Sequence, residues 1–267
     1  MTPVITIAYM PGGYGSYLSW IIDRFNKFRM QHEPRVTDDP FLSDGSSHGY
    51  VSHCKIETEE SFVDGYIAAS KMPSPWDYNI YAGWPKGNIS HNINHLLEIM
   101  SPHDRILLIE CNGVSNHILR WIRNEATMDQ HRWWKMYGIT SETQYEEVFE
   151  DEWLSSSRYH PDDVRAGVDP RMMDINIDDV LEPKNSWRQL LIHDFLRWPV
   201  IDRDLYQESA RTFHKLQEPY LRKRSDMLNL DVLTQQGRDR IEAELTPVQR
   251  AIVNVQRNRK RKGSLWI

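Results

Sequence analysis

The chain opens on a strand, a glycine-rich turn and a helix, and this succession constrains the fold more than any other feature. Residues 4–7 are all β-branched, residues 11–16 have the sequence PGGYGS, and apolar residues then recur at helical spacing as far as residue 25. Glycines let a backbone turn tightly and come close to a ligand. The amides of the turn and of the helix N-terminus would then face an anion. The stretch predicts a phosphate-binding turn, and the alternative is a tight strand-to-helix connection without a ligand.

Strands and helices continue to alternate through the first half of the chain. Residues 78–82 and 105–109 are predicted strands, and helices are predicted to end at Met100 and to span 114–126. The segment RILLI at 105–109 is apolar on both faces, which is typical of a central parallel strand. This alternation predicts an α/β fold, with a three-layer parallel sheet and right-handed crossovers.

The second half of the chain has a different composition. Residues 127–172 are rich in Trp, Tyr, Glu and Ser, and we expect a helical insertion or lid there within a single domain of residues 1–267. A short edge strand is predicted at 174–177, and helices at 203–224 and 238–257. Residues 257–267 form a basic tail, for which a solvated charge run, a cofactor contact and a nucleic-acid contact all remain open.

Composition narrows the classes of function. The net charge of −6 over 267 residues argues against a general polyanion binder. Two cysteines provide neither a disulfide framework nor zinc-ligand spacing, which fits a reducing compartment. Apolar runs are too short for a membrane span, and the predicted strand near the N-terminus leaves no room for a signal peptide. We therefore expect a cytoplasmic protein.

Several segments follow one another in the order seen in a known family. They are PGGYGSYL at 11–18, YAGWP at 81–85, RILLIECN at 105–112, DDVLEP at 178–183 followed by DFL at 194–196, and RKG at 261–263. In this order they resemble the PAPS-dependent sulfotransferase family, a branch of the P-loop α/β fold. The resemblance implies PAPS as co-substrate, held by residues at the glycine turn and at two later sites: Gly12, Gly13, Tyr14, Gly15, Ser16, Tyr17, Ser115, Arg261, Lys262 and Gly263.

The sequence departs from the family at charged positions. Gly12 and Gly13 occupy the region of the loop lysine, and Glu110 stands where an arginine is expected after the central strand. A Walker-type Gly-Lys-Ser is also missing, which disfavours a conventional ATPase or kinase. Three interpretations remain: a sulfotransferase-like enzyme, a non-catalytic nucleotide-binding or interaction protein on the same fold, and an atypical P-loop nucleotide enzyme.

Sulfuryl transfer would also need a base and a cation. Histidine suits a general base at neutral pH, and the candidates are His53 and, second, His91. Lys86 and Arg120 are the candidate cations near the leaving oxygen. His91 and His95 have the spacing of two metal ligands on a helix, but no third ligand is indicated, so no metal is expected.

Overall fold

The chain forms two compact units in a computed structural model. The first unit contains Met1–Cys111 and Tyr159–Leu216, and the second contains Asn112–Arg158 and Gln217–Ile267. The residues that the structure describes are 2–10, 12–24, 55–56, 61–73, 78–85, 89–110, 114–127, 139, 141–156, 169–178, 195–196 and 203–261.

The first unit is built on a parallel sheet of five strands in the order β2-β3-β1-β4-β5. The strands are β1 (Val4–Ala8), β2 (Lys55–Ile56), β3 (Asn79–Gly83), β4 (Arg105–Glu110) and β5 (Met172–Asn176). Every residue of β1 is buried, as expected for a strand covered on both faces. The predicted α/β fold with a parallel sheet and flanking helices is confirmed, and the predicted strand at 174–177 overlaps the edge strand β5.

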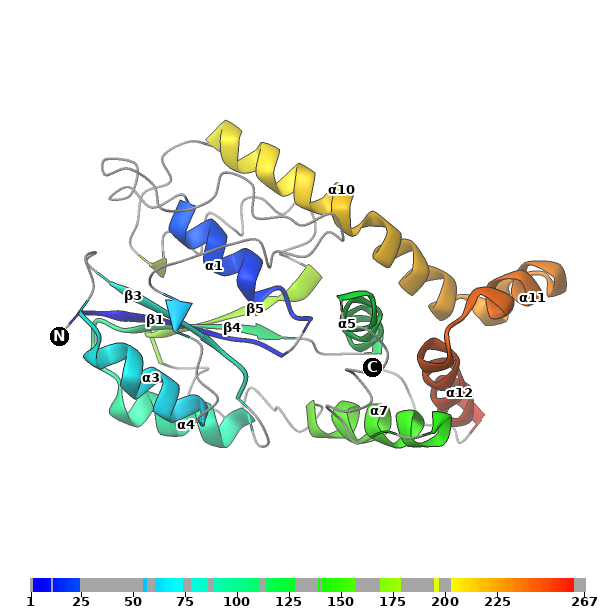
Figure 1. Ribbon diagram of the computed structural model, residues 1–267, viewed down its shortest axis with the longest axis horizontal. Helices are drawn as coiled ribbons and strands as arrows, with labels where there is room; N and C mark the ends of the chain where they lie inside the picture. The colour runs from blue at the N-terminus through cyan, green and yellow to red at the C-terminus, as the bar shows by residue number, and fades with distance from the viewer. Residues whose placement is uncertain are drawn as a thin grey trace. The chain divides into compact units, whose positions relative to one another are not determined.

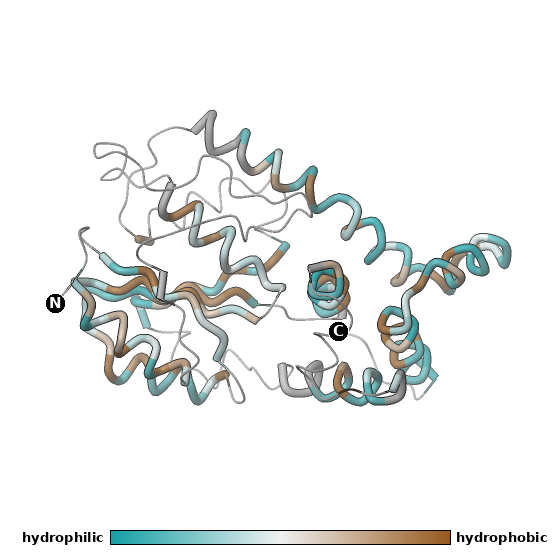
Figure 2. The backbone as a smooth tube through the Cα atoms, viewed as in Figure 1, coloured by the Kyte–Doolittle hydropathy of each residue, from teal (hydrophilic) through white to brown (hydrophobic). Residues whose placement is uncertain are grey.

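Helices cover both faces of this sheet (Figure 1). The helix α1 (Gly15–Arg24) lies on one face, and α3 (Phe62–Lys71) and α4 (Ile89–Ile99) lie together on the other. The hydrophobic residues of the first unit follow the strands (Figure 2). On the α3 side they form one cluster, in which Ile93, Leu96 and Leu97 of α4 show the expected helical spacing.

The buried Asp104 and the half-buried Arg171 fix the edge of the sheet at which the strands begin. The Asp104 carboxylate accepts hydrogen bonds from the Val4 amide at 2.7 Å, the Ser101 amide at 2.7 Å and the Tyr66 hydroxyl at 2.6 Å. The Arg171 guanidinium donates to the Leu97 carbonyl at 2.8 Å and pairs with Asp169. Hydrogen bonding to Arg171 holds the pKa of Asp169 below its usual range. Together these contacts anchor β1, β4, α3 and α4 at this edge.

The second unit is helical. It contains α5 (Val114–Thr127), α7 (Glu142–Ser156), the later part of α10 (Arg203–Leu228), the short 3₁₀ helix η4 (Leu230–Val232), α11 (Gln235–Glu244) and α12 (Pro247–Arg261). Its core includes Trp121 of α5, Tyr145 and Phe149 of α7 and Ile252 of α12. The predicted insertion at 127–172 thus includes α7 of this unit and the first residue of β5 in the other.

The predicted helix at 238–257 is wrong as a single element. The structure has two helices, α11 and α12, with Leu245 and Thr246 between them. Proline has no amide hydrogen and suits the first position of a helix, so Pro247 begins α12 and cannot continue α11. None of the described helices is both long and apolar enough to cross a membrane.

Candidate functional site

The glycine turn follows the carboxyl end of the central strand β1. Gly12 has a φ of 79°, in the left-handed region that glycine adopts readily. Tyr14 has a φ of 65°, which is uncommon for a residue with a side chain and is a form of local backbone strain. The Gly13 amide donates to the Met10 carbonyl at 2.7 Å, and the Leu18 amide donates to the Tyr14 carbonyl at 3.1 Å. These bonds close the turn and begin α1.

The sheet topology places this turn where chain connections diverge. The connection leaving β1 runs through α1 on one face, whereas the connection leaving the neighbouring strand β3 runs through α4 on the other (Figure 1). In open α/β sheets, ligands bind outside the carboxyl ends of strands at such a switch point. The sequence-predicted turn therefore lies at the favoured position for a ligand in this class of fold.

Backbone amides are the main groups that the turn offers to an anion. The first amides of a helix have no acceptor inside the helix, and its N-terminus carries a partial positive charge. The first turn of α1 contains no acidic residue that would neutralise this charge. Gly12 is half-buried, whereas the residues from Gly13 to Tyr17 are buried, with 8% of Ser16 exposed. An anion would thus reach the turn mainly from the Gly12 side and at Ser16.

Tyr9 is a residue of this turn that sequence reasoning missed. A Cβ atom added to Gly15 would lie 2.2 Å from the Cδ1 atom of Tyr9, so Gly15 admits the tyrosine ring. The Tyr9 amide donates to the Gly83 carbonyl at 3.1 Å, which ties the end of β1 to that of β3. The sequence predicts that the glycines of the turn allow a ligand to come close. In the structure, Gly15 allows the Tyr9 ring to come close. The sequence does contain a signal for this role, because Tyr9 is an aromatic residue directly after the buried strand β1.

The side chain of Tyr17 has a packing role. Its ring stacks on Phe213 of α10, with the ring centroids 3.6 Å apart, and Phe213 also meets the edge of Tyr14 at 5.3 Å. Tyr17 is fully buried, and this burial raises the pKa of its hydroxyl above the ordinary range. The rings of Tyr14 and Tyr17 therefore fix the turn against α10.

The other predicted site residues are distributed over the chain. His91 is exposed in α4 of the first unit, and its ring centroid lies 6.4 Å from that of His95. Among the described residues, no group of acidic, histidine or cysteine side chains could hold a metal ion. Ser115 lies in α5 and Arg261 ends α12, both in the second unit. His53, Lys86, Lys262 and Gly263 lie outside the described residues.

The candidate cation Arg120 is fully buried in α5 of the second unit. Its guanidinium carbon lies 5.6 Å from the centroid of the Trp121 ring. His117, one helical turn before Trp121, is also buried, and burial together with the Arg120 charge lowers its pKa to about 3. His117 is therefore neutral near pH 7.

The basic residues near the C-terminus are engaged within the second unit. Arg257 pairs with Glu242, Arg259 pairs with Glu150 at 2.8 Å, and Lys260 pairs with Asp231 at 2.6 Å. All three belong to α12. These pairs offset much of the local positive charge on which both the nucleic-acid and the cofactor interpretations of this segment depend.

Comparison with known proteins gives no match among family models, curated proteins or solved structures.

Proposed function

We propose that the turn at residues 9–16 binds the phosphate end of a nucleotide, and that the chain is a sulfotransferase-like protein that uses PAPS. The observation that carries this proposal is the position of the turn. A glycine turn with left-handed residues at Gly12 and Tyr14 follows the central parallel strand at the switch point of the sheet. The motif order in the sequence supports PAPS over other nucleotides.

The proposed chemistry needs positioning and charge stabilisation more than covalent catalysis. In sulfuryl transfer, the bond between sulfur and the 5′-phosphate oxygen breaks and a bond from sulfur to an acceptor oxygen or nitrogen forms. The acceptor proton passes to a base. The amides of Gly12 and of residues 14–17, together with the Ser16 hydroxyl, would stabilise the leaving phosphate, since the Gly13 amide already donates to Met10. His53 or His91 would take the proton.

Binding without transfer is a second candidate function. The described turn and the start of α1 carry no lysine or arginine side chain before Arg24. A turn made of amides alone can hold a phosphate, but it lacks the cation that would stabilise charge on the leaving oxygen. Ligand binding and sulfuryl transfer therefore need separate measurements.

The binding experiment compares PAP, ATP and NAD as ligands of the full chain. A ligand that binds only the folded state raises the melting temperature, so PAP should raise it and ATP and NAD should raise it less. Ser16→Ala should weaken PAP binding by about tenfold, the effect of one hydrogen bond to a charged group. Ser70→Ala is the matched control, because Ser70 donates to the Ile67 carbonyl at the end of α3. No stabilisation by PAP, or equal effects of both variants, would remove the turn from the proposal.

Transfer is tested separately by measuring PAP and sulfate formed from PAPS. Formation that depends on Ser16 supports the sulfotransferase function. PAP binding without turnover of PAPS, across a panel of hydroxyl and amine acceptors, supports the non-catalytic function.

A further inference from the structure

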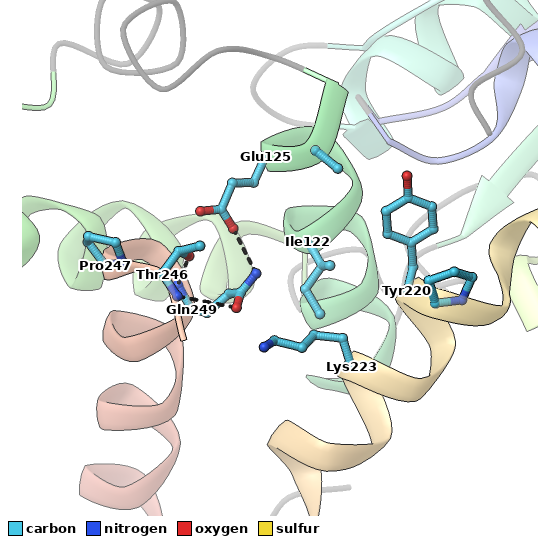
Figure 3. A pocket seen from close by; sticks show the side chains of 9 residues that line it. Ile122, Glu125, Tyr220, Lys223, Thr246, Pro247 and Gln249 are labelled. Carbon is cyan, nitrogen blue, oxygen red and sulfur yellow. Dashed lines mark hydrogen bonds between the residues drawn. The ribbon is translucent and has the colours of Figure 1, made fainter. Parts of the chain in front are cut away.

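A pocket in the second unit is lined by none of the residues assigned above to nucleotide binding. Its volume is about 530 Å³, within the range of small-molecule sites and far above the space of one water molecule. Residues of α5, α10 and the N-terminus of α12 line it, all of them in the second unit (Figure 3). Ile122, Pro219 and Pro247 contribute apolar walls.

One wall of the pocket presents a carboxylate that is held in place. Glu125 accepts a hydrogen bond from the Gln249 side-chain amide at 3.1 Å. Thr246 and Gln249 in turn form a capping box at the start of α12. The Gln249 amide donates to the Thr246 hydroxyl at 3.3 Å, and the Thr246 amide donates to the Gln249 side-chain oxygen at 3.4 Å. The carboxylate therefore lies at the positive end of a helix and has capacity for further donors.

The opposite wall presents a cation. The Lys223 side chain extends from α10 toward the side on which Thr246 and Gln249 lie (Figure 3). Its ammonium group donates to the Glu244 carbonyl at 3.3 Å and has other hydrogens to donate. The described side chains of Glu125 and Lys223 form no ion pair with each other. Burial raises the pKa of Glu125, and the nearby Lys223 charge offsets part of this rise. Opposite charges thus face one space from two walls.

An aromatic ring completes the lining. Tyr220 is half-buried, and the Arg123 guanidinium carbon lies 5.3 Å from its ring centroid. A half-buried ring beside proline and isoleucine provides contact area for an apolar group of a ligand.

We infer that this pocket binds a small zwitterion of the amino-acid class with an apolar side chain. The amino group of the ligand would donate to Glu125, and its carboxylate would accept from Lys223. Both interactions join a charged donor to a charged acceptor and are stronger than neutral hydrogen bonds. The apolar side chain would fill the space between Ile122, Pro219 and Tyr220. A ligand with only one charge would leave one protein charge without its partner.

The experiment uses L-phenylalanine as the zwitterionic probe, with phenethylamine and 3-phenylpropionate as probes that lack one charged group. Dissociation constants are measured by NMR titration of the full chain. L-Phenylalanine should bind at least tenfold more tightly than either truncated probe, as expected for one charged hydrogen bond. Binding of L-phenylalanine that is not saturable, or equal affinities for the three probes, overturns the inference.

Two variants assign the charges. Glu125→Gln should weaken the binding of L-phenylalanine and of phenethylamine about tenfold and leave the binding of 3-phenylpropionate unchanged. Lys223→Met should weaken the binding of L-phenylalanine and of 3-phenylpropionate about tenfold and leave the binding of phenethylamine unchanged. The glutamine keeps an acceptor for Gln249, and Lys223→Met gives an independent result where the first variant is unstable. Glu147→Gln and Lys215→Met are matched controls, because both side chains are exposed and outside the pocket. If a variant loses the same affinity for the positively charged probe as for the negatively charged one, the assignment of the two charges is wrong. PAP reports on the first unit and L-phenylalanine on the second, so the two proposals can fail independently.

Discussion

At the scale of single residues, burial decides the role of several side chains that sequence patterns leave open. Tyr17 belongs to the glycine turn by position, yet its ring is fully buried against Phe213. His117 belongs to an ordinary amphipathic helix by sequence, yet it is buried beside Arg120. His117 yields a prediction because a buried group responds strongly to a change in its charge.

His117 predicts a loss of stability in acid. Its pKa of about 3 in the folded chain is below the ordinary value of 6.5, so between these values the unfolded chain binds more protons. The stabilisation is complete above pH 6.5 and is lost as the pH falls toward 3. From pH 7 to pH 5 the free energy of unfolding should fall by roughly 2 kcal/mol through this residue.

Urea denaturation at both pH values measures the effect. His117→Gln should remove most of this pH dependence. His91→Gln, which changes an exposed histidine of α4, should leave it intact. An unchanged pH dependence in His117→Gln would contradict the assignment.

Gly15 and Tyr9 should be energetically coupled. A Cβ at residue 15 would lie 2.2 Å from the Tyr9 ring, so Gly15→Ala should lower the free energy of unfolding by about 1–3 kcal/mol. Removing the ring in Tyr9→Ala relieves the clash, and the double variant should be more stable than the sum of the two changes by about 1 kcal/mol.

Gly237→Ala provides a comparison for this pair. Its Cβ would meet the Thr234 hydroxyl at 3.3 Å, a much milder contact. The free energy of unfolding should therefore change less than in Gly15→Ala. Simple additivity of the Tyr9 and Gly15 changes would show that the ring does not set the glycine requirement.

At the scale of elements, helix ends organise the second unit. Thr246 caps α12 by accepting from the Gln249 amide, and the Gln249 side chain donates to Glu125, so this cap serves both the helix and the pocket. Thr234 caps α11 by accepting from the Gly237 amide at 3.3 Å, at an exposed position. The two threonines thus form a natural pair for comparing a cap with a tertiary contact and a cap without one.

Thr246→Ala should cost more stability than Thr234→Ala. Loss of a threonine cap typically costs about 1 kcal/mol. Thr246→Ala additionally releases Gln249 from the capping box, and Gln249 is the donor to the half-buried Glu125 carboxylate, which adds on the order of 1 kcal/mol. Chemical denaturation of the two single variants measures the difference. Equal losses of unfolding free energy in the two variants would show that the Thr246 cap does not support the contact between Gln249 and Glu125.

At the scale of the whole molecule, charge argues against polyanion binding. The net charge is −6, and the basic residues Arg257, Arg259 and Lys260 are paired with carboxylates in the second unit. Binding to nucleic acid depends on lysines and arginines that can reach phosphates. Because these three cations are already paired with carboxylates, the basic segment has less charge to offer to phosphates.

We expect single-stranded DNA to bind weakly, and to bind more tightly when the partner acids are neutralised. The variant Glu150→Gln, Glu242→Gln, Asp231→Asn frees the three cations and should show stronger binding with a steeper dependence on salt. A control with the same change in net charge is Glu147→Gln, Asp151→Asn, Asp226→Asn, which alters exposed acids elsewhere in the second unit. Fluorescence anisotropy measures both. Equal behaviour of the two variants would show that net charge alone matters.

Local patterns determined the elements of this protein. The buried runs at Val4–Ala8 and Arg105–Glu110 identified parallel strands because sheet residues covered on both faces are uniformly apolar. The glycine turn was placed correctly between β1 and α1 because strand, turn and helix are adjacent in sequence. The break before Pro247 could also have been predicted from the sequence, since proline cannot continue a helix. The prediction of one helix at 238–257 did not take this proline into account.

Tertiary structure alone decided what surrounds these elements. Gln249 meets Glu125 from 124 positions away, and Arg259 meets Glu150 from 109. No periodicity or motif encodes such pairings, because they depend on how helices far apart in sequence pack together. The same holds for Phe213, which fixes Tyr17 from α10. The sequence by itself therefore determined a parallel α/β sheet with a glycine turn at its centre, whereas packing decided which side chains are buried and where a charged pocket lies.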